Sequence, residues 1–264
     1  MSSTPDGTQD GADIVRVGVD ERMGVITIDR PSARNAIDLA VSERVAAAVD
    51  DMESRPDVAV IVITGAGGMF SAGMDLKAFA RGERPAIPGR GLCGLTDHEV
   101  SKPIIAAVEG YALAGGFEVA LAADLIVASR SANFGVPEVT RGLVAAGGGL
   151  MRMAKSMPYG AAMDLVLTGD RFGAERAHAL GLVTHLSAEG EALADAAAVA
   201  RRIAANAPLA VQLTKRIVST VVGWSDEQQY AWQRGVAEAA FASEDAKEGA
   251  AAFVEKRSPV WKGR

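Results

Sequence analysis

The sequence predicts an α/β fold, and three observations lead to this prediction. Over about the first 190 residues, short apolar segments alternate with helical patterns, as when strands and crossover helices follow one another. Several apolar segments continue without polar interruption, which is typical of strands buried on both faces. The last 70 or so residues carry only helical patterns. The chain is therefore expected to combine a strand–helix layer with a helical C-terminal region.

The individual elements follow from local patterns. Residues 14–19 and 24–29 flank a polar turn and predict a β-hairpin. Residues 36–54 place apolar side chains at steps of three and four, which predicts an amphipathic helix. Apolar segments at 57–64 and 103–108 each end at glycines, which predicts a sharp turn from strand into helix. We further expect strands at 125–129 and 182–186, an extended stretch at 133–139, and helices at 117–123, 150–156, 161–167, 174–180, 191–206, 208–222, 225–241 and 244–256.

Some segments lack a regular pattern. Residues 82–97 are rich in glycine and proline and predict a mobile surface segment, which carries the single cysteine, Cys93. Residues 143–149 predict a loop of glycine and alanine, and Ser243 is expected to cap the last helix. The expected organisation is a flexible N-terminal tail at 1–11, a core at 12–199 and a C-terminal helical region at 200–264.

Composition excludes several classes of function. The 264 residues contain 27 Lys and Arg against 33 Asp and Glu, a net charge of −6, which argues against nucleic acid or an anionic membrane as partner. The most apolar stretch, 103–129, is interrupted by charged residues, so no membrane span is expected. One cysteine allows no intrachain disulfide, which fits a cytoplasmic location. Three histidines, without HExxH or paired CxxC motifs, argue against a metal site.

Two glycine-rich turns are candidates for chemistry. They are GAGGMFSAGMDLK at 65–77 and GYALAGGFE at 110–118, and each follows a predicted buried strand. Backbone amides at such turns point outward and can bind an oxygen anion. Two turns from neighbouring parallel strands can direct two amides at one point, which is an oxyanion hole. Neither turn has the spacing of a P-loop or a dinucleotide fingerprint, and an ordinary strand–helix turn is the alternative for both.

Two glutamates form the second candidate. Glu118 lies in FEVALAA, a predicted helix that is apolar on nearly every face, where a charge needs a partner or a function. Glu138 follows Pro137 in the predicted extended stretch, between apolar residues. Two carboxylates with raised pKa values beside an oxyanion hole can divide the roles of base and acid. A solvated surface position is the alternative for each glutamate.

The chain resembles the crotonase, or enoyl-CoA hydratase/isomerase, superfamily over about residues 12–264. Five motifs carry the resemblance, and their order and spacing are specific for the superfamily. They are IDRPSARNA at 28–36, FSAGMDLK at 70–77, AVEGYALAGGFE at 107–118, FGVPE at 134–138 and LTGD at 167–170. The ending at 244–264 resembles the branch that includes carnitinyl-CoA dehydratase. The resemblance implies a spiral of repeated ββα units with a C-terminal helical oligomerisation region.

The resemblance also implies a coenzyme A thioester substrate and a set of site residues. The oxyanion-hole amides fall on Met74 and Gly115, and the catalytic carboxylates fall on Glu118 and Glu138. Met74 replaces the commoner alanine, and Ala146 replaces a glycine close to the reacting water. The substrate and CoA contacts fall on Ala33, Arg34, Ala72, Asp75, Leu76, Lys77, Phe253 and Lys256, the last two reaching the CoA of a neighbouring subunit.

The expected function is that of an enoyl-CoA hydratase. Glu118 would deprotonate water for syn addition to a 2-enoyl-CoA, and Glu138 would deliver the proton, giving a 3-hydroxyacyl-CoA reversibly. The resemblance implies a homotrimer or homohexamer, and no cofactor besides the coenzyme A of the substrate. A carnitinyl-CoA dehydratase-like enzyme and an enoyl-CoA isomerase, which needs only one carboxylate, are the alternatives among enzymes. A non-catalytic acyl-CoA-binding protein is the alternative of another class.

Overall fold

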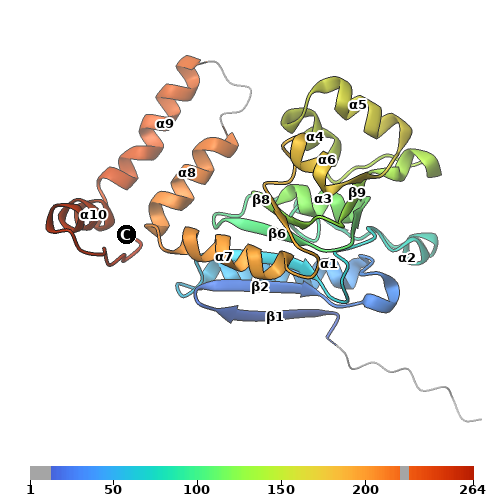
Figure 1. Ribbon diagram of the computed structural model, residues 1–264, viewed down its shortest axis with the longest axis horizontal. Helices are drawn as coiled ribbons and strands as arrows, with labels where there is room; N and C mark the ends of the chain where they lie inside the picture. Colours follow the sequence, from blue (N-terminus) through green and yellow to red (C-terminus); the bar gives the residue numbers. More distant parts are fainter. Residues whose placement is uncertain (1–12, 221–225) are drawn as a thin grey trace, which may run out of the picture.

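The computed structural model describes residues 13–220 and 226–264 and is built around a six-stranded sheet (Figure 1). The predicted tail at 1–11 lies outside the described residues. In sheet order the strands are β1 (Val15–Asp20), β2 (Met23–Ile28), β3 (Val60–Gly65), β6 (Ile104–Val108), β8 (Leu125–Ser129) and β11 (His185–Ser187). The first two strands form the predicted antiparallel hairpin, and every other neighbouring pair is parallel.

A second, smaller layer of strands lies beside this sheet. It pairs β7 (Tyr111–Leu113), β9 (Asn133–Gly135) and β10 (Phe172–Gly173), and single bridges extend it from Ala112 to Ser71 and from Met74 to Ile37. The chain passes from β6 to β7 and then into α3 (Gly115–Ala122), and from β3 through residues 71–74 into α2 (Leu76–Ala80). This repetition confirms the α/β class and the predicted spiral of ββα units.

Helices cover both faces of the large sheet. On β3, Ile61 and Ile63 face a core shared with α1 (Leu39–Ser54), while Val60 and Val62 face α7 (Ala192–Ala204). Both faces are apolar because alternate side chains of a strand point to opposite sides. Four buried alanines at intervals of four residues form the α7 face, and they are Ala192, Ala196, Ala200 and Ala204. Small side chains on one helix face let α7 lie close to the sheet.

The remaining helices lie on one edge of the core and in the C-terminal region. They are α4 (Gly149–Ser156), α5 (Tyr159–Thr168), α6 (Ala174–Ala179), α8 (Pro208–Thr220), α9 (Asp226–Phe241) and α10 (Glu244–Glu255). The Ser243 hydroxyl accepts the Ala246 N–H, which confirms the predicted cap of α10. The chain end returns to α7, where the Trp261 indole donates to the Ala205 carbonyl at 2.8 Å. Figure 1 shows α8–α10 at one end of the molecule and α2 at the other.

Two further findings concern the layout of the helices. The predicted boundary between residues 199 and 200 falls inside α7, which packs on the sheet as one continuous helix. Among the described residues, no helix has both the length and the hydropathy needed to cross a bilayer.

The prediction for residues 82–97 was wrong for the second half of the segment. The segment forms a short hairpin of β4 (Ala86–Ile87) and β5 (Gly91–Leu92); β4 stays near the surface, whereas Leu92, Cys93 and Leu95 are buried in the core. Cys93 is completely buried, and its N–H donates to the Ser42 hydroxyl at 3.2 Å. Burial raises the pKa of the Cys93 thiol to about 12. Glycine and proline here shape tight turns that carry apolar residues inward.

The predicted extended stretch at 133–139 and the strand at 182–186 also needed correction. Only β9 is extended, and after Val136 the 3₁₀ helix η2 (Pro137–Arg141) begins. Proline favours the first helical position because its ring fixes φ and its missing N–H would have no helical partner there. The last strand, β11, begins at His185, because Leu182 and Val183 complete the turn after α6 through hydrogen bonds to Ala177.

Candidate active site

Two backbone amides, those of Met74 and Gly115, lie next to each other at the junction of two ββα units. A methyl group on Gly115 would lie 3.5 Å from the Met74 nitrogen, and one on Gly73 would lie 2.9 Å from the Gly115 nitrogen. Within the part of the chain that the structure describes, neither the Met74 nor the Gly115 N–H donates to a protein acceptor. Two such amides at this spacing can donate to one oxygen atom.

Backbone conformation explains how the two amides come together. Gly73 has a φ of +91°, and a side chain there would strike the Leu113 carbonyl at 2.7 Å, so only glycine allows this close approach. Ala114 has a φ of 50° and a ψ of −131°, which an L-residue rarely adopts. Hydrogen bonds hold Ala114 on both sides, since its N–H donates to Gly135 and its carbonyl accepts from α3.

Glu118 lies in the first turn of α3 and is only 4% exposed. Its Oε1 accepts the Gly149 N–H at 3.0 Å. A methyl group on Gly147 or on Gly149 would lie 2.8 Å from the Glu118 side chain, so the predicted glycine loop makes room for this carboxyl group. Burial raises the pKa of Glu118, although the N–H groups of Gly149 and Gly147 and the charge of Arg152 oppose the rise.

Glu138 lies in η2, and its position there differs from the extended backbone that the sequence predicted. Its Oε2 is buried and has no hydrogen-bond partner among the described residues. The pKa of Glu138 is raised, mainly by burial and further by the negative charge of Glu118. A backbone hydrogen bond and the charge of Arg141 act in the opposite direction. The charge of Glu118 thus acts on Glu138, and both carboxyl groups are at least partly buried, so neither is the solvated surface residue of the alternative interpretation.

Arg152 is a site residue that sequence reasoning missed. From α4 it donates to the Gly147 carbonyl at 3.3 Å and to the Thr96 carbonyl at 3.0 Å. Burial lowers the pKa of Arg152, and the charge of Glu118 acts in the opposite direction. No local sequence signal marks this role, because the contact with Thr96 spans 56 residues.

The predicted CoA contacts divide into two groups. The Arg34 carbonyl accepts the Ala72 N–H at 3.0 Å, so the segment of Ala33 and Arg34 lies against the loop that leads to α2. Leu76 and Lys77 are exposed in the first turn of α2. Phe253, 85% exposed, and Lys256 lie at the end of α10, at the other end of the molecule (Figure 1). Within one chain, therefore, the two sets of predicted CoA contacts lie far apart.

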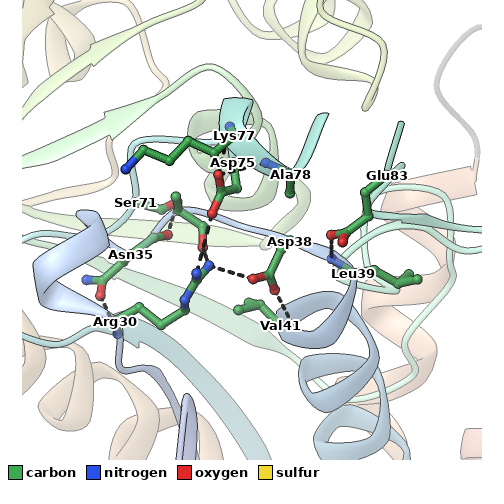
Figure 2. A network of polar contacts seen from close by, with 11 residues as sticks. Arg30, Asn35, Asp38, Leu39, Val41, Ser71, Asp75, Lys77, Ala78 and Glu83 are labelled. Carbon is green, nitrogen blue, oxygen red and sulfur yellow. Dashed lines mark hydrogen bonds and ion pairs between the residues drawn. The ribbon is translucent and has the colours of Figure 1, made fainter. Parts of the chain in front are cut away.

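Asp75 occupies the expected loop, but its carboxylate faces the protein. Figure 2 shows it directed at Arg30, which also pairs with Asp38. Arg30 lies in the first quoted motif, and sequence reasoning assigned it no role. Among the described residues, His, Cys, Asp and Glu do not gather in any group of three or more that could hold a metal ion.

The Met74 and Gly115 amides lie side by side, Glu118 lies one helical turn after Gly115, and the charge of Glu118 acts on Glu138. The Met74 and Gly115 amides can stabilise negative charge on a carbonyl oxygen. Glu118 and Glu138, with raised pKa values, can move protons at neighbouring atoms. The site is thus suited to adding or removing a proton next to a carbonyl group.

Comparisons with known proteins show which family the chain resembles. A family model described as enoyl-CoA hydratase/isomerase matches residues 18–264. The carnitinyl-CoA dehydratase of Escherichia coli O157:H7 is 44% identical over 248 residues, covering 90% of this chain and 94% of the relative. An enoyl-CoA hydratase structure from Mycobacterium tuberculosis H37Rv has a TM-score of 0.93 and 55% identity, covering 95% of this chain and 99% of that one. A carnitinyl-CoA hydratase structure from Mycobacterium avium has a TM-score of 0.77 and 44% identity, with coverages of 96% and 100%.

Proposed function

The chain belongs to the enoyl-CoA hydratase/isomerase family, and from this premise we propose that it adds water reversibly to a 2-enoyl-CoA thioester. The product is a 3-hydroxyacyl-CoA, and addition is syn. The observation that carries the proposal is the pair of buried carboxyl groups, Glu118 and Glu138, beside the adjacent amides of Met74 and Gly115. An isomerase needs only one carboxylate, so the presence of two favours hydration or dehydration.

In the proposed mechanism each group has one role. Glu118 accepts a proton from water while the water oxygen bonds to C3 of the substrate. The C2=C3 electron pair moves toward the thioester, whose oxygen gains charge and is held by the Met74 and Gly115 N–H groups. Glu138 then gives its proton to C2. Removing one oxyanion-hole donor typically costs about 2.7–4 kcal/mol of transition-state stabilisation.

The surroundings of the two glutamates support this division of roles. Glu118 accepts backbone N–H groups and lies near Arg152, and both interactions favour the carboxylate that a base requires. Glu138 has a buried oxygen without a partner and lies near the charge of Glu118, and both features favour the protonated acid. The difference between the two environments is what separates base from acid.

Mutation of each glutamate tests the proposal. Glu118→Gln and Glu138→Gln should each lower kcat on crotonyl-CoA by about 10²-fold or more, with CoA-ester binding nearly unchanged. Hydration is followed by the loss of absorbance of the conjugated thioester. Glu53→Gln is the matched control, because that carboxylate accepts hydrogen bonds from Ser101 away from the site. Turnover by the double variant at the wild-type rate would disprove the assignment.

A second candidate is the dehydration of carnitinyl-CoA, favoured by the 44% identity to the Escherichia coli carnitinyl-CoA dehydratase. The two candidates differ in the group at C4, which is a quaternary ammonium in the carnitinyl substrate. The ratio of kcat/KM for carnitinyl-CoA to that for 3-hydroxybutanoyl-CoA separates them, and a 3-enoyl-CoA detects isomerase activity. Tight binding of CoA esters without any turnover would identify an acyl-CoA-binding protein instead.

We also propose that the chain forms a trimer or a dimer of trimers. The C-terminal helices and the segment after them expose large apolar side chains, including Val218, Phe241, Phe253, Val254 and Val260. Contact with a neighbouring subunit would remove these side chains from water. It would also allow Phe253 and Lys256 to reach the neighbour's CoA.

A further inference from the structure

Arg30 joins two segments that are far apart in the sequence (Figure 2). Its Nη1 lies 2.9 Å from Oδ2 of Asp38 and donates to the Ala36 carbonyl at 2.6 Å. Its Nη2 lies 3.4 Å from Oδ2 of Asp75. Only 21% of the Arg30 side chain is exposed, so these interactions are partly shielded from water. A planar guanidinium can serve two carboxylates at once, which the single ammonium of lysine does less well.

Each of the two aspartates also caps a helix. Oδ1 of Asp38 accepts the Val41 N–H at 2.9 Å at the start of α1. Oδ1 of Asp75 accepts the Lys77 N–H at 2.9 Å and the Ala78 N–H at 3.2 Å at the start of α2. Burial acts to raise the pKa of Asp75, but these N–H donors and Arg30 outweigh it, and the pKa lies below its ordinary value. Arg30 therefore links the first turns of two helices through the aspartates that cap them.

The Met74 amide lies within this linkage. Ile37 donates its N–H to the Gly73 carbonyl and accepts the Asp75 N–H, both at 2.8 Å. These two bonds hold the residues on either side of Met74 and leave its own N–H unpaired. Ile37 and Met74 pair across the two segments, and the next residue of each segment is an aspartate, Asp38 or Asp75. Arg30 contacts both aspartates and so joins the two segments directly beside the Met74 amide.

We propose that Arg30 is a positioning residue that holds the Met74 amide beside the Gly115 amide. Without the clamp, the 71–76 segment keeps its bonds to Ile37 but loses the charged contact that fixes α2 against the start of α1. The Met74 N–H then spends less time in the geometry that serves the thioester oxygen, so the transition state suffers more than substrate binding. This inference rests on the proposed role of the two amides in binding a thioester carbonyl.

The experiment compares Arg30→Met with Arg22→Met. Arg22 directly precedes β2 and donates to the Ala204 carbonyl at 3.0 Å, so it is a part-buried arginine at the opposite end of the same strand. Arg30→Met should lower kcat on crotonyl-CoA tenfold or more, with KM and the Kd of free CoA within threefold of wild type. Arg22→Met should leave kcat unchanged. Arg30→Lys is the second variant if the methionine variant does not fold, and it should retain part of kcat.

A vibrational measurement reports on the amides without needing turnover. In complexes with butanoyl-CoA labelled with ¹³C at the thioester carbon, the carbonyl stretch should rise in Arg30→Met, because weaker donation leaves the C=O bond stronger. A fall in kcat without this rise would overturn the inference, and so would a normal kcat. If wild type shows no hydration but the carbonyl stretch still changes as expected, the proposed reaction fails while the role of Arg30 is supported.

Discussion

Replacing Gly147 with alanine should displace the Glu118 carboxyl group while leaving the fold intact. The added methyl group would lie 2.8 Å from Oε2 of Glu118 and 3.1 Å from its Cδ. Gly147 is not among the glycines with positive φ, so alanine can adopt its backbone conformation. The perturbation therefore falls on the position of one side chain.

The expected loss follows from the size of this displacement. Ordinary van der Waals contact begins at 3.4 Å, so the carboxyl oxygen must move by about 0.6 Å. A misplacement of 1 Å in an active site can cost about 10²-fold in rate, so a loss of roughly tenfold in kcat is expected, or about 1.4 kcal/mol. KM should change little, because the role proposed for Glu118 is to act on the attacking water and not on the CoA portion.

Steady-state hydration of crotonyl-CoA, together with thermal unfolding, checks this prediction. Gly160→Ala is the matched control, since a methyl group there meets no atom within 4 Å and the residue lies inside α5. The control should keep wild-type kcat and gain about 0.5–1 kcal/mol of stability. If Gly147→Ala has wild-type kcat and a normal unfolding temperature, the exact placement of Glu118 does not limit the reaction and the reasoning fails.

Three further predictions concern charge. Arg152→Met removes a positive charge near Glu118 and raises the pKa of that carboxyl further, so the acid limb of the kcat/KM profile should move to higher pH; an unmoved limb would contradict this. Burial raises the folded-state pKa of Glu118, so the wild type should lose stability as the pH rises from the pKa of an unfolded glutamate through this higher value. Glu118→Gln lacks the titrating group and should not lose this stability. Calorimetry should therefore show the stability of the variant relative to wild type increasing with pH in this window, and showing no such trend below it. Lys256→Glu should raise KM for CoA substrates, more at low salt, without changing turnover of a thioester lacking the nucleotide; a monomer by light scattering would rule out the cross-subunit contact.

The large sheet could be predicted because its strands are continuous apolar runs between polar turns. The hairpin, β3, β6 and β8 were each found within a few residues of their observed bounds. The two glycine turns were also identified, since glycine at a strand end marks a close approach of backbone. The second layer was missed at β7 and β10, which have three and two residues and show no alternation long enough to detect.

The clamp and the arginine near Glu118 could not be predicted for another reason. Arg30 meets Asp75 at a sequence separation of 45 residues, and Arg152 meets Thr96 at a separation of 56. Such pairs depend on how the ββα units stack, which local periodicity does not encode. The burial of residues 92–95 was missed for the same reason, because the core that receives them is built from distant segments.

The strained backbone of Ala114 has a thermodynamic consequence for binding. A non-glycine residue in such a conformation costs of the order of 1–3 kcal/mol, and here hydrogen bonds within the protein hold it in place. If the two amides bind a thioester carbonyl as proposed, the donor pair is already ordered, and an entering thioester need not order the backbone around it. Ala114→Gly would relieve the strain and increase stability, yet it would add an unfavourable entropy of ordering to acyl-CoA binding. The free energy of folding thus keeps the two amides aligned, and the free energy of substrate binding is not needed to align them.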